Sequence, residues 1–396
     1  MTAGEKPRIS LVGVTGYASI YVDLVRKAQQ EGRLDVSALM VREQRSDHET
    51  VKEFQQTGTK VYHSFDAMCE GEAGKIDLCL IPTGIQLHAS MTNKALRSGA
   101  HVLVEKPLTG SVKDALSIIH TEKETRRWVA VGFQDIYSRD IAWFKQQLLE
   151  GVIGKIKAVK VIGFWPRAIS YYHRNNWAGK LMVDGWAAMD SPLNNAFAHF
   201  VNIALFVAGP QPNKSCNVMV TSADLYRAHD IESFDTGIVQ GMSDSGIEFW
   251  FGVSHACAER REPEIHIIGE EGTAQWNHEQ DMIIRPKNGN VLTQPVPDYA
   301  ATRSAMFDAV IEKLLKPDTF ICDTQMAICQ TQIIDAIHKF APIRTVANAG
   351  IDFVQGADEE FITPAIKGVE RLFERAFDEN VSLSEIGSIP TLPAKP

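Results

Sequence analysis

The stretch that decides the fold is residues 99–108, which read GAHVLVEKPL. Residues 102–104 form a short apolar run between a glycine and a charged segment, a pattern typical of a buried strand. Lys106 follows directly, so it is predicted to stand just past the carboxyl end of that strand, where open α/β sheets bind ligands. Lys106 is therefore a candidate catalytic amine. A lone lysine in such a turn is more often a solvated surface residue, so the motifs around Lys106 must decide between the two interpretations.

The sequence around this stretch alternates short apolar runs with helical patterns. The predicted strands are 9–12, 36–41, 76–81, 101–104 and 129–133, and the predicted helices are 20–30, 86–97 and 112–124. Repeated short β-α units of this kind predict a parallel sheet with helices on both faces. We therefore expect one doubly wound α/β domain over residues 1–134.

Beyond a helix predicted over 139–149, the pattern changes to longer strands with few helices. These strands are 156–164, 216–226, 236–243, 247–254, 264–268, 273–277 and 282–285. Tight turns join several of them and predict an antiparallel sheet. Helical patterns follow over 300–315, 324–340 and 365–377. We expect an α+β domain over residues 135–380 and a loosely held, Pro-rich tail over 381–396.

Charge and composition limit the classes of function. The chain has 396 residues, a formal net charge of -9 and a pI near 5.8, which argue against nucleic acid or anionic membrane as the main partner. Its six cysteines contain no C-x-x-C pair and are predicted to be reduced, mostly buried thiols. No apolar export segment precedes the first strand, so we expect a cytoplasmic protein.

A glycine turn joins the first predicted strand to the first predicted helix. Gly13, Thr15, Gly16, Tyr17 and Ala18 belong to the turn GVTGYA, which is similar to the dinucleotide fingerprint G-x-G-x-x-G/A. Gly13 would make the tight turn, and Ala18 would let the helix pack closely on the strand. The amino end of the helix would then face a pyrophosphate. Thr15 replaces the second glycine, and Gly16 could take over part of its role.

The second predicted strand ends at Arg42, where an NAD-binding domain usually has a carboxylate for the ribose hydroxyls. Arg42 and Arg45 could instead pair with a 2′-phosphate. This arrangement favours NADP modestly over NAD. The alternative is that both arginines are solvated and Glu43 reaches the ribose.

Residues 191–208 predict a buried helix, because Ser191 suits the N-cap, a proline follows it and a Gly-Pro pair ends the pattern. Asn195, His199 and Asn202 would share one face of this helix, at positions i, i+4 and i+7. Polar side chains on a buried helix need hydrogen bonds, either to the core or to a ligand. We therefore treat the three as candidate site residues.

These motifs resemble those of glucose-fructose oxidoreductase, inositol dehydrogenase and the rhizopine-catabolism proteins, the Gfo/Idh/MocA family. The matching segments are 13–18, 76–83 with His88, 99–108, 132–134, 150–155 and 269–273. The resemblance implies a Rossmann domain over 1–134 that binds the dinucleotide. It also implies a substrate-binding and oligomerisation domain over 135–380 with a large open, mostly antiparallel sheet, and an assembly that we expect to be a homodimer or homotetramer.

The resemblance also implies hydride transfer between NAD(P) and a ring hydroxyl or ketone of a sugar, cyclitol or related polyol. Lys106 would bind the reacting hydroxyl and help to move its proton, with His199 as its partner. The matched segments add four cofactor-binding candidates to the glycine turn, namely Thr83, His88, Glu105 and Gln134.

The family often has D-x-x-x-H-x-x-D where this chain has amides at Asn195 and Asn202. An amide is no base at neutral pH, so proton transfer would fall to Lys106, His199 or both. Asn195 can still hold a substrate hydroxyl. Glu105 is expected to point away from the amine of Lys106.

An aromatic and polar cluster over residues 165–177 contains further candidate substrate contacts, namely Tyr172, Arg174 and Trp177. Stacking rings with hydrogen-bonding side chains suit a sugar, although an ordered surface loop or a subunit contact would have the same composition. The histidines show no metal-ligand spacing, so we expect no metal. Two other functions stay open: a redox-neutral sugar-modifying enzyme with tightly bound cofactor, and a non-catalytic sensor of dinucleotide or sugar.

Overall fold

A parallel sheet forms the first domain of the computed structural model, which describes residues 5–355 and 362–393. Its strands are β1 (Arg8–Val12), β2 (Asp35–Met40), β3 (Lys60–Tyr62), β4 (Leu78–Ile81), β5 (His101–Val104) and β6 (Val129–Val131). They lie in the order β3-β2-β1-β4-β5-β6, and every pairing is parallel. The order reverses between β1 and β4, which places a ligand crevice at the carboxyl ends of those strands.

Helices cover both faces of this sheet. They are α1 (Ala18–Gln30), α2 (Glu49–Gln56), α3 (Phe65–Gly71), α4 (Ile85–Arg97) and α5 (Val112–Thr125). The predicted α/β class and the predicted strands and helices are confirmed to within a few residues. Three elements, α2, β3 and α3, had not been predicted, because their short amphipathic patterns are weak signals.

The second domain is built on a sheet of nine strands. They are β7 (Ile156–Phe164), β10 (Val218–Arg227), β11 (Thr236–Ser243), β12 (Glu248–Ser254), β13 (Arg261–Gly269), β14 (Gly272–Asn277), β15 (Asp281–Pro286), β16 (Leu292–Pro295) and β17 (Ile343–Thr345). The pairings β7–β12 and β10–β17 are parallel, and the others are antiparallel. The predicted, mostly antiparallel sheet is therefore confirmed.

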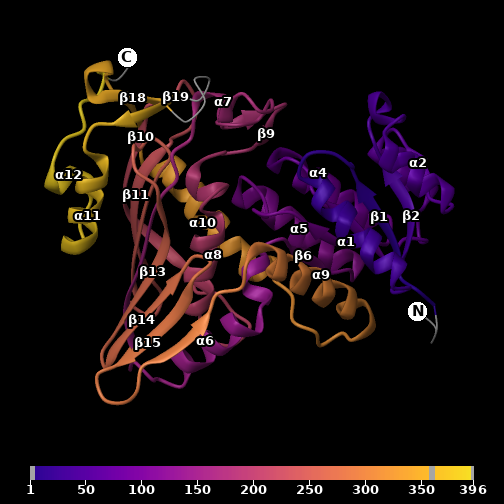
Figure 1. The fold of residues 1–396 in the computed structure, drawn as a ribbon. Coiled ribbons are helices and arrows are strands. Elements are labelled where there is room, and N and C mark those ends of the chain that lie inside the picture. The colour runs from indigo at the N-terminus through magenta and orange to yellow at the C-terminus, as the bar shows by residue number, and fades with distance from the viewer. Residues whose placement is uncertain (1–4, 356–361, 394–396) are drawn as a thin grey trace.

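Helices join the two domains (Figure 1). α8 (Ala198–Val207) and α10 (Thr324–Phe340) lie between the large sheet and the first domain, and α10 packs on α5. α9 (Tyr299–Leu315) packs on the 3-10 helix η2 (Gln134–Tyr137). At the edge of the first sheet the amide of Val131 donates to the carbonyl of Cys322 over 2.8 Å. One hydrophobic core therefore runs through both domains.

The opposite side of the large sheet has its own smaller core under α11 (Val369–Glu379), and α12 (Leu383–Ile386) follows it. The predicted helix over 365–377 begins later, because residues 362–366 form strand β19 (Ile362–Ile366) against β18 (Ile351–Gln355). Leu383 and Ile389 are buried. These two side chains of the tail therefore pack on the smaller core.

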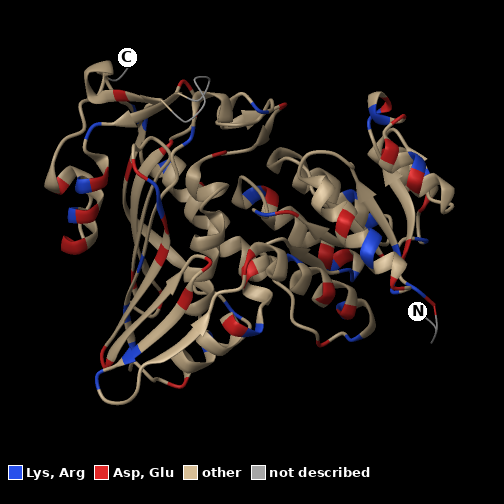
Figure 2. Cartoon of the chain, in the orientation of Figure 1, with Lys and Arg blue, Asp and Glu red and all other residues tan. Residues whose placement is uncertain are grey.

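Lys and Arg alternate with Asp and Glu over both domains (Figure 2). All six cysteines are buried free thiols, as predicted. Among the described residues, no helix has the length and apolar character needed to cross a bilayer, and no group of three His, Cys, Asp or Glu side chains is placed to hold a metal ion.

Candidate active site

A large cavity, about 740 Å³, lies at the carboxyl ends of the first-domain strands and is lined from both domains. A second cavity of about 410 Å³ shares several of its residues and extends along the glycine turn and the end of β2. Of the predicted cofactor residues, Gly13, Thr15, Gly16, Tyr17, Ala18, Arg42, Thr83, Glu105 and Lys106 line one or both cavities. The structure therefore brings most of the predicted dinucleotide site together.

The glycine turn has the backbone that a phosphate cradle needs. Gly13 has a φ of +84°, and its amide donates to the carbonyl of Met40 over 2.8 Å. Gly16 has a φ of +64°, and a Cβ added there would meet nothing within 4 Å. The open side of the turn and the amino end of α1, which begins at Ala18, are suited to an anion. Thr15 therefore does not close the groove.

Arg42 and Arg45 are exposed, line both cavities and form no ion pair with any described acidic residue. Glu43, the alternative partner of the ribose, lines neither cavity. Cationic side chains therefore occupy the end of β2 on the cavity side.

Lys106 stands after β5, as predicted, and its Nζ donates to two oxygens of Asn195. The distances are 2.8 Å to the backbone carbonyl and 3.1 Å to Oδ1. Asn195 Nδ2 donates in turn to Asp190 Oδ1 over 2.8 Å, and Asp190 Oδ2 accepts from the amide of Gly179 over 2.6 Å. Burial lowers the pKa of Lys106 and raises the pKa of Asp190. Asp190 had not been predicted as a site residue.

The predicted continuous helix over 191–208 is wrong. A 3-10 turn, η3 (Pro192–Asn194), ends at Asn195, which has φ -129° and ψ -87°, and α8 starts at Ala198. Ser191 does cap the first turn, since its side chain accepts from the amide of Asn194. Asn195 therefore leaves the helical face of His199, and its contacts with Lys106 and Asp190 hold this irregular backbone.

His199 faces the carboxylate of Asp135, which had not been predicted as a site residue. Its Nδ1 lies 2.8 Å from Asp135 Oδ2, an ion-pair distance, although the angle is not that of a hydrogen bond. Both residues are buried. Asp135 belongs to η2, which follows the strand β6. A carboxylate just past the end of a predicted strand was therefore the feature of the sequence that could have identified Asp135.

Glu105 points away from the amine of Lys106, as expected. Its Oε1 accepts from the hydroxyl of Tyr21 over 2.6 Å, and its Oε2 accepts from the backbone amide of Lys106 over 3.0 Å. Burial raises the pKa of Glu105.

Five predicted site residues are buried and line neither cavity of the described structure: His88, Gln134, Tyr172, His199 and Asn202. His88 contacts the backbone carbonyls of Pro107 and Thr83, at 2.8 and 3.2 Å, and so supports the turn that carries Lys106. The hydroxyl of Tyr172 contacts His255, and the neighbouring Tyr171 takes its place in the cavity wall.

The other predicted substrate contacts, Arg174 and Trp177, do line the large cavity. Trp177 also lines the second cavity and packs on Gly84 at the start of α4, where an added Cβ would lie 2.8 Å from its indole nitrogen. Trp177 therefore lies on the dinucleotide side of the site.

Two family models together match most of this chain. A model for an oxidoreductase family with an NAD-binding Rossmann fold matches residues 8–133, and the model of the GFO/IDH/MocA C-terminal domain matches residues 141–275. The chain belongs to the Gfo/Idh/MocA family. The predicted resemblance is thereby confirmed.

Curated Gfo/Idh/MocA relatives match over part of their length. The chain is 27% identical to a dTDP-3,4-didehydro-2,6-dideoxy-alpha-D-glucose 3-reductase of Streptomyces violaceoruber, over 40% of this chain and 46% of that protein. It is 26% identical to an inositol 2-dehydrogenase/D-chiro-inositol 3-dehydrogenase of Lactiplantibacillus plantarum, over 59% of this chain and 62% of that protein. These alignments therefore span about half to three-fifths of the relatives' length.

Solved structures share the fold over most of the chain. The WlbA dehydrogenase of Bordetella pertussis, in complex with NADH and UDP-GlcNAcA, has a TM-score of 0.68 at 21% identity, over 85% of this chain and 96% of that one. KijD10, a 3-ketoreductase of Actinomadura kijaniata in complex with NADP and TDP-benzene, has a TM-score of 0.66 at 17% identity, over 87% and 100%.

Proposed function

We propose that this protein is an NAD(P)-dependent oxidoreductase that transfers hydride between a nicotinamide and a ring hydroxyl or ketone of a sugar, cyclitol or related polyol. The observation that carries the proposal is the position of Lys106, whose amine lies in the same cavity as the glycine turn. Named relatives that reduce a keto-sugar or oxidise inositol support the same class of substrate. Residues 1–134 would hold the dinucleotide, and residues 135–380 the substrate and the contacts between subunits of a homodimer or homotetramer.

The residues present fit a nicotinamide dinucleotide. The open glycine turn and the amino end of α1 would hold the pyrophosphate, and Arg42 with Arg45 would pair with a 2′-phosphate. This arrangement supports a modest preference for NADP. When bound, the nicotinamide supplies the acceptor or donor of the hydride.

Lys106 would hold the reacting hydroxyl and accept its proton. Burial lowers the pKa of its amine, so a larger fraction is neutral near pH 7 than in water. Asn195 fixes the direction of Nζ through two hydrogen bonds. His199, whose Nδ1 lies 2.8 Å from Asp135, would be the partner of Lys106 in proton transfer.

The experiment that tests the proposal is a screen of sugars and cyclitols with both dinucleotides, followed by substitution of Lys106. We expect Lys106→Ala to lose about a hundredfold or more in turnover while it still binds dinucleotide, because a positioned acid-base group contributes that much. Lys106→Arg keeps the positive charge but supplies no base, so its turnover should be as slow as that of Lys106→Ala. Near-normal turnover in Lys106→Ala would remove Lys106 from the mechanism, and binding of polyols without any turnover would favour a sensor.

A further inference from the structure

Two arginines of the second domain lie over one aromatic ring. The guanidinium carbons of Arg167 and Arg174 are 4.7 and 3.7 Å from the centre of the Tyr171 ring. Tyr171 and Arg174 line the large cavity together with Lys106. Arg167 lines a third cavity of about 480 Å³, and the Tyr299 ring in its wall lies 6.2 Å from the ring of His199. Arg174 therefore shares the cavity of Lys106, and Arg167 lies beside the same tyrosine ring at the third cavity.

Neither guanidinium forms an ion pair with an acidic residue of the described structure. Arg174 donates to the backbone carbonyl of Tyr171 over 2.6 Å, and the Nε of Arg167 is buried without a hydrogen-bond partner. By contrast, Arg260, in the wall of the third cavity, pairs with Glu262 at 2.5 Å. The buried Nε of Arg167 is unfavourable without a partner unless a ligand supplies an acceptor.

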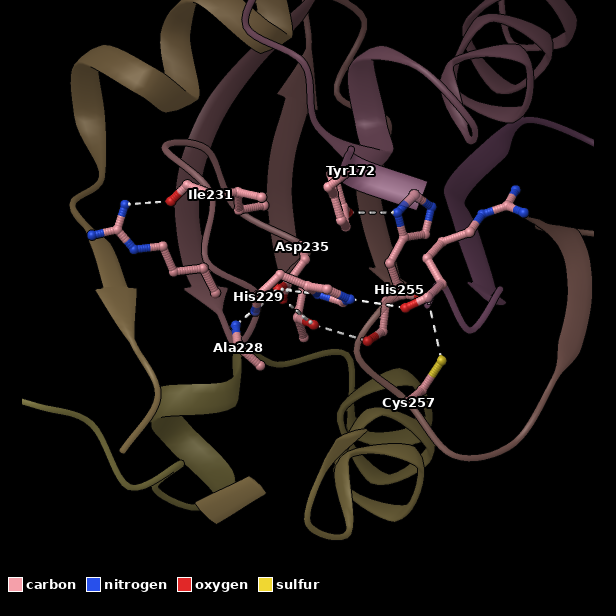
Figure 3. A network of polar contacts seen from close by, with 11 residues as sticks. Tyr172, Ala228, His229, Ile231, Asp235, His255 and Cys257 are labelled. Atoms are coloured by element: carbon pink, nitrogen blue, oxygen red, sulfur yellow. Dashed lines mark hydrogen bonds and ion pairs between the residues drawn. The ribbon is translucent and has the colours of Figure 1, made fainter. Parts of the chain in front are cut away.

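A buried network holds the backbone that carries Arg167 (Figure 3). The amide of Arg167 donates to the carbonyl of His255 over 3.0 Å, and its own carbonyl lies 2.8 Å from Nε2 of His229. The Nδ1 of His229 lies 2.8 Å from Asp235, whose Oδ2 also accepts from the amides of Ala228 and His229.

The buried His229 and Asp235 therefore hold the backbone carbonyl of Arg167 in place. Support of this kind is what a preorganised binding residue requires.

We propose that the substrate carries an anionic group, a carboxylate or a phosphate ester, which Arg167 and Arg174 bind beside Tyr171. Guanidinium groups bind such planar or tetrahedral oxyanions through paired hydrogen bonds. The phosphates of the dinucleotide would be bound separately, by the glycine turn, Arg42 and Arg45 of the first domain. This inference rests on the proposed function, because it concerns a group of the same substrate that takes no part in hydride transfer.

Calorimetric titration of the dinucleotide-saturated protein tests this assignment. Inorganic phosphate and acetate are the probes that do not depend on the identity of the sugar. Glucuronate, glucose 6-phosphate, UDP-glucuronate and glucose then separate a carboxylate from a phosphate and both from a neutral ring. We expect anions to bind to the wild type, and Arg167→Gln and Arg174→Gln each to weaken that binding about tenfold or more.

Lys180→Gln is the matched control, because Lys180 lies near this segment, pairs with Glu232 at 2.9 Å and lines none of the three cavities. It should bind anions as the wild type does. The proposal is overturned if the wild type binds no anion, if both arginine variants keep their affinity, or if they lose affinity for the dinucleotide instead. Retained anion binding without turnover of any polyol would refute the proposed oxidoreductase but not the anion site.

Discussion

At the scale of single residues, the side-chain amide of Asn195 connects the carboxylate of Asp190 to the amine of Lys106. The family often has acidic residues four positions before and three positions after the histidine that corresponds to His199. In this chain Asn195 occupies the first of those two positions. Its side chain joins Lys106 to Asp190, so the negative charge lies five residues earlier in the chain and acts on Lys106 through the amide. Asp190 is therefore a positioning residue for Lys106 and Asn195.

Asp190→Asn tests this role. Burial lowers the pKa of Lys106, and the charge of Asp190 partly offsets that effect by raising it. Removing the charge should lower the pKa of Lys106 further. Oxidation of the alcohol needs the neutral amine, so the acid limb of the pH profile of kcat should move to lower pH.

The matched control is Asp230→Asn, since Asp230 is exposed. A profile of Asp190→Asn that coincides with that of the wild type, in a folded variant, would show that Asp190 only supports the loop.

At the scale of elements, the turn between β2 and the 3-10 helix η1 (Glu43–Arg45) decides the proposed cofactor preference. Arg42 precedes η1 and lines both cavities. Arg42→Ala should weaken NADP about tenfold and leave NAD nearly unchanged, because only NADP carries the 2′-phosphate. Titration of both dinucleotides into the wild type and the variant measures this. Tighter binding of NAD by the wild type, unaffected by the substitution, would place the adenosine ribose elsewhere.

At the scale of the whole molecule, a buried lysine makes the stability depend on pH. Lys145 on α6 (Arg139–Leu149) donates to the carbonyl of Lys214 over 2.6 Å and lies 3.8 Å from the centre of the Phe206 ring. Burial lowers its pKa to about 7 from the ordinary value of 10.5. Between these two values the unfolded chain binds more protons than the folded one, so the free energy of unfolding should rise with pH.

The measurement is urea denaturation at pH 7, 8 and 9 for the wild type and Lys145→Met. The wild type should gain up to about 1.4 kcal/mol per pH unit relative to the variant, with no gain below the folded pKa. Lys113→Met, at an exposed lysine of α5, is the control and should follow the wild type. Parallel curves for the wild type and Lys145→Met would show that Lys145 is not neutral in the folded protein.

The sequence by itself determined most of the longer elements of both domains and the groups that lie in one short segment. Apolar periodicity predicted β7 and α10 to the residue, and Lys106 and the glycine turn were found because a strand end and its turn are contiguous. The break at Asn195 was not predicted, because a short capped turn and a helix start share the same local pattern.

Only the tertiary structure decided which of these groups meet. Asn195 contacts Lys106 across 89 residues of sequence, and His199 meets Asp135 from another element. The tertiary structure also buried His88, Gln134, Tyr172, His199 and Asn202 outside the two cavities. Periodicity reports which face of an element is apolar, but the partner of a buried polar group depends on how distant elements pack.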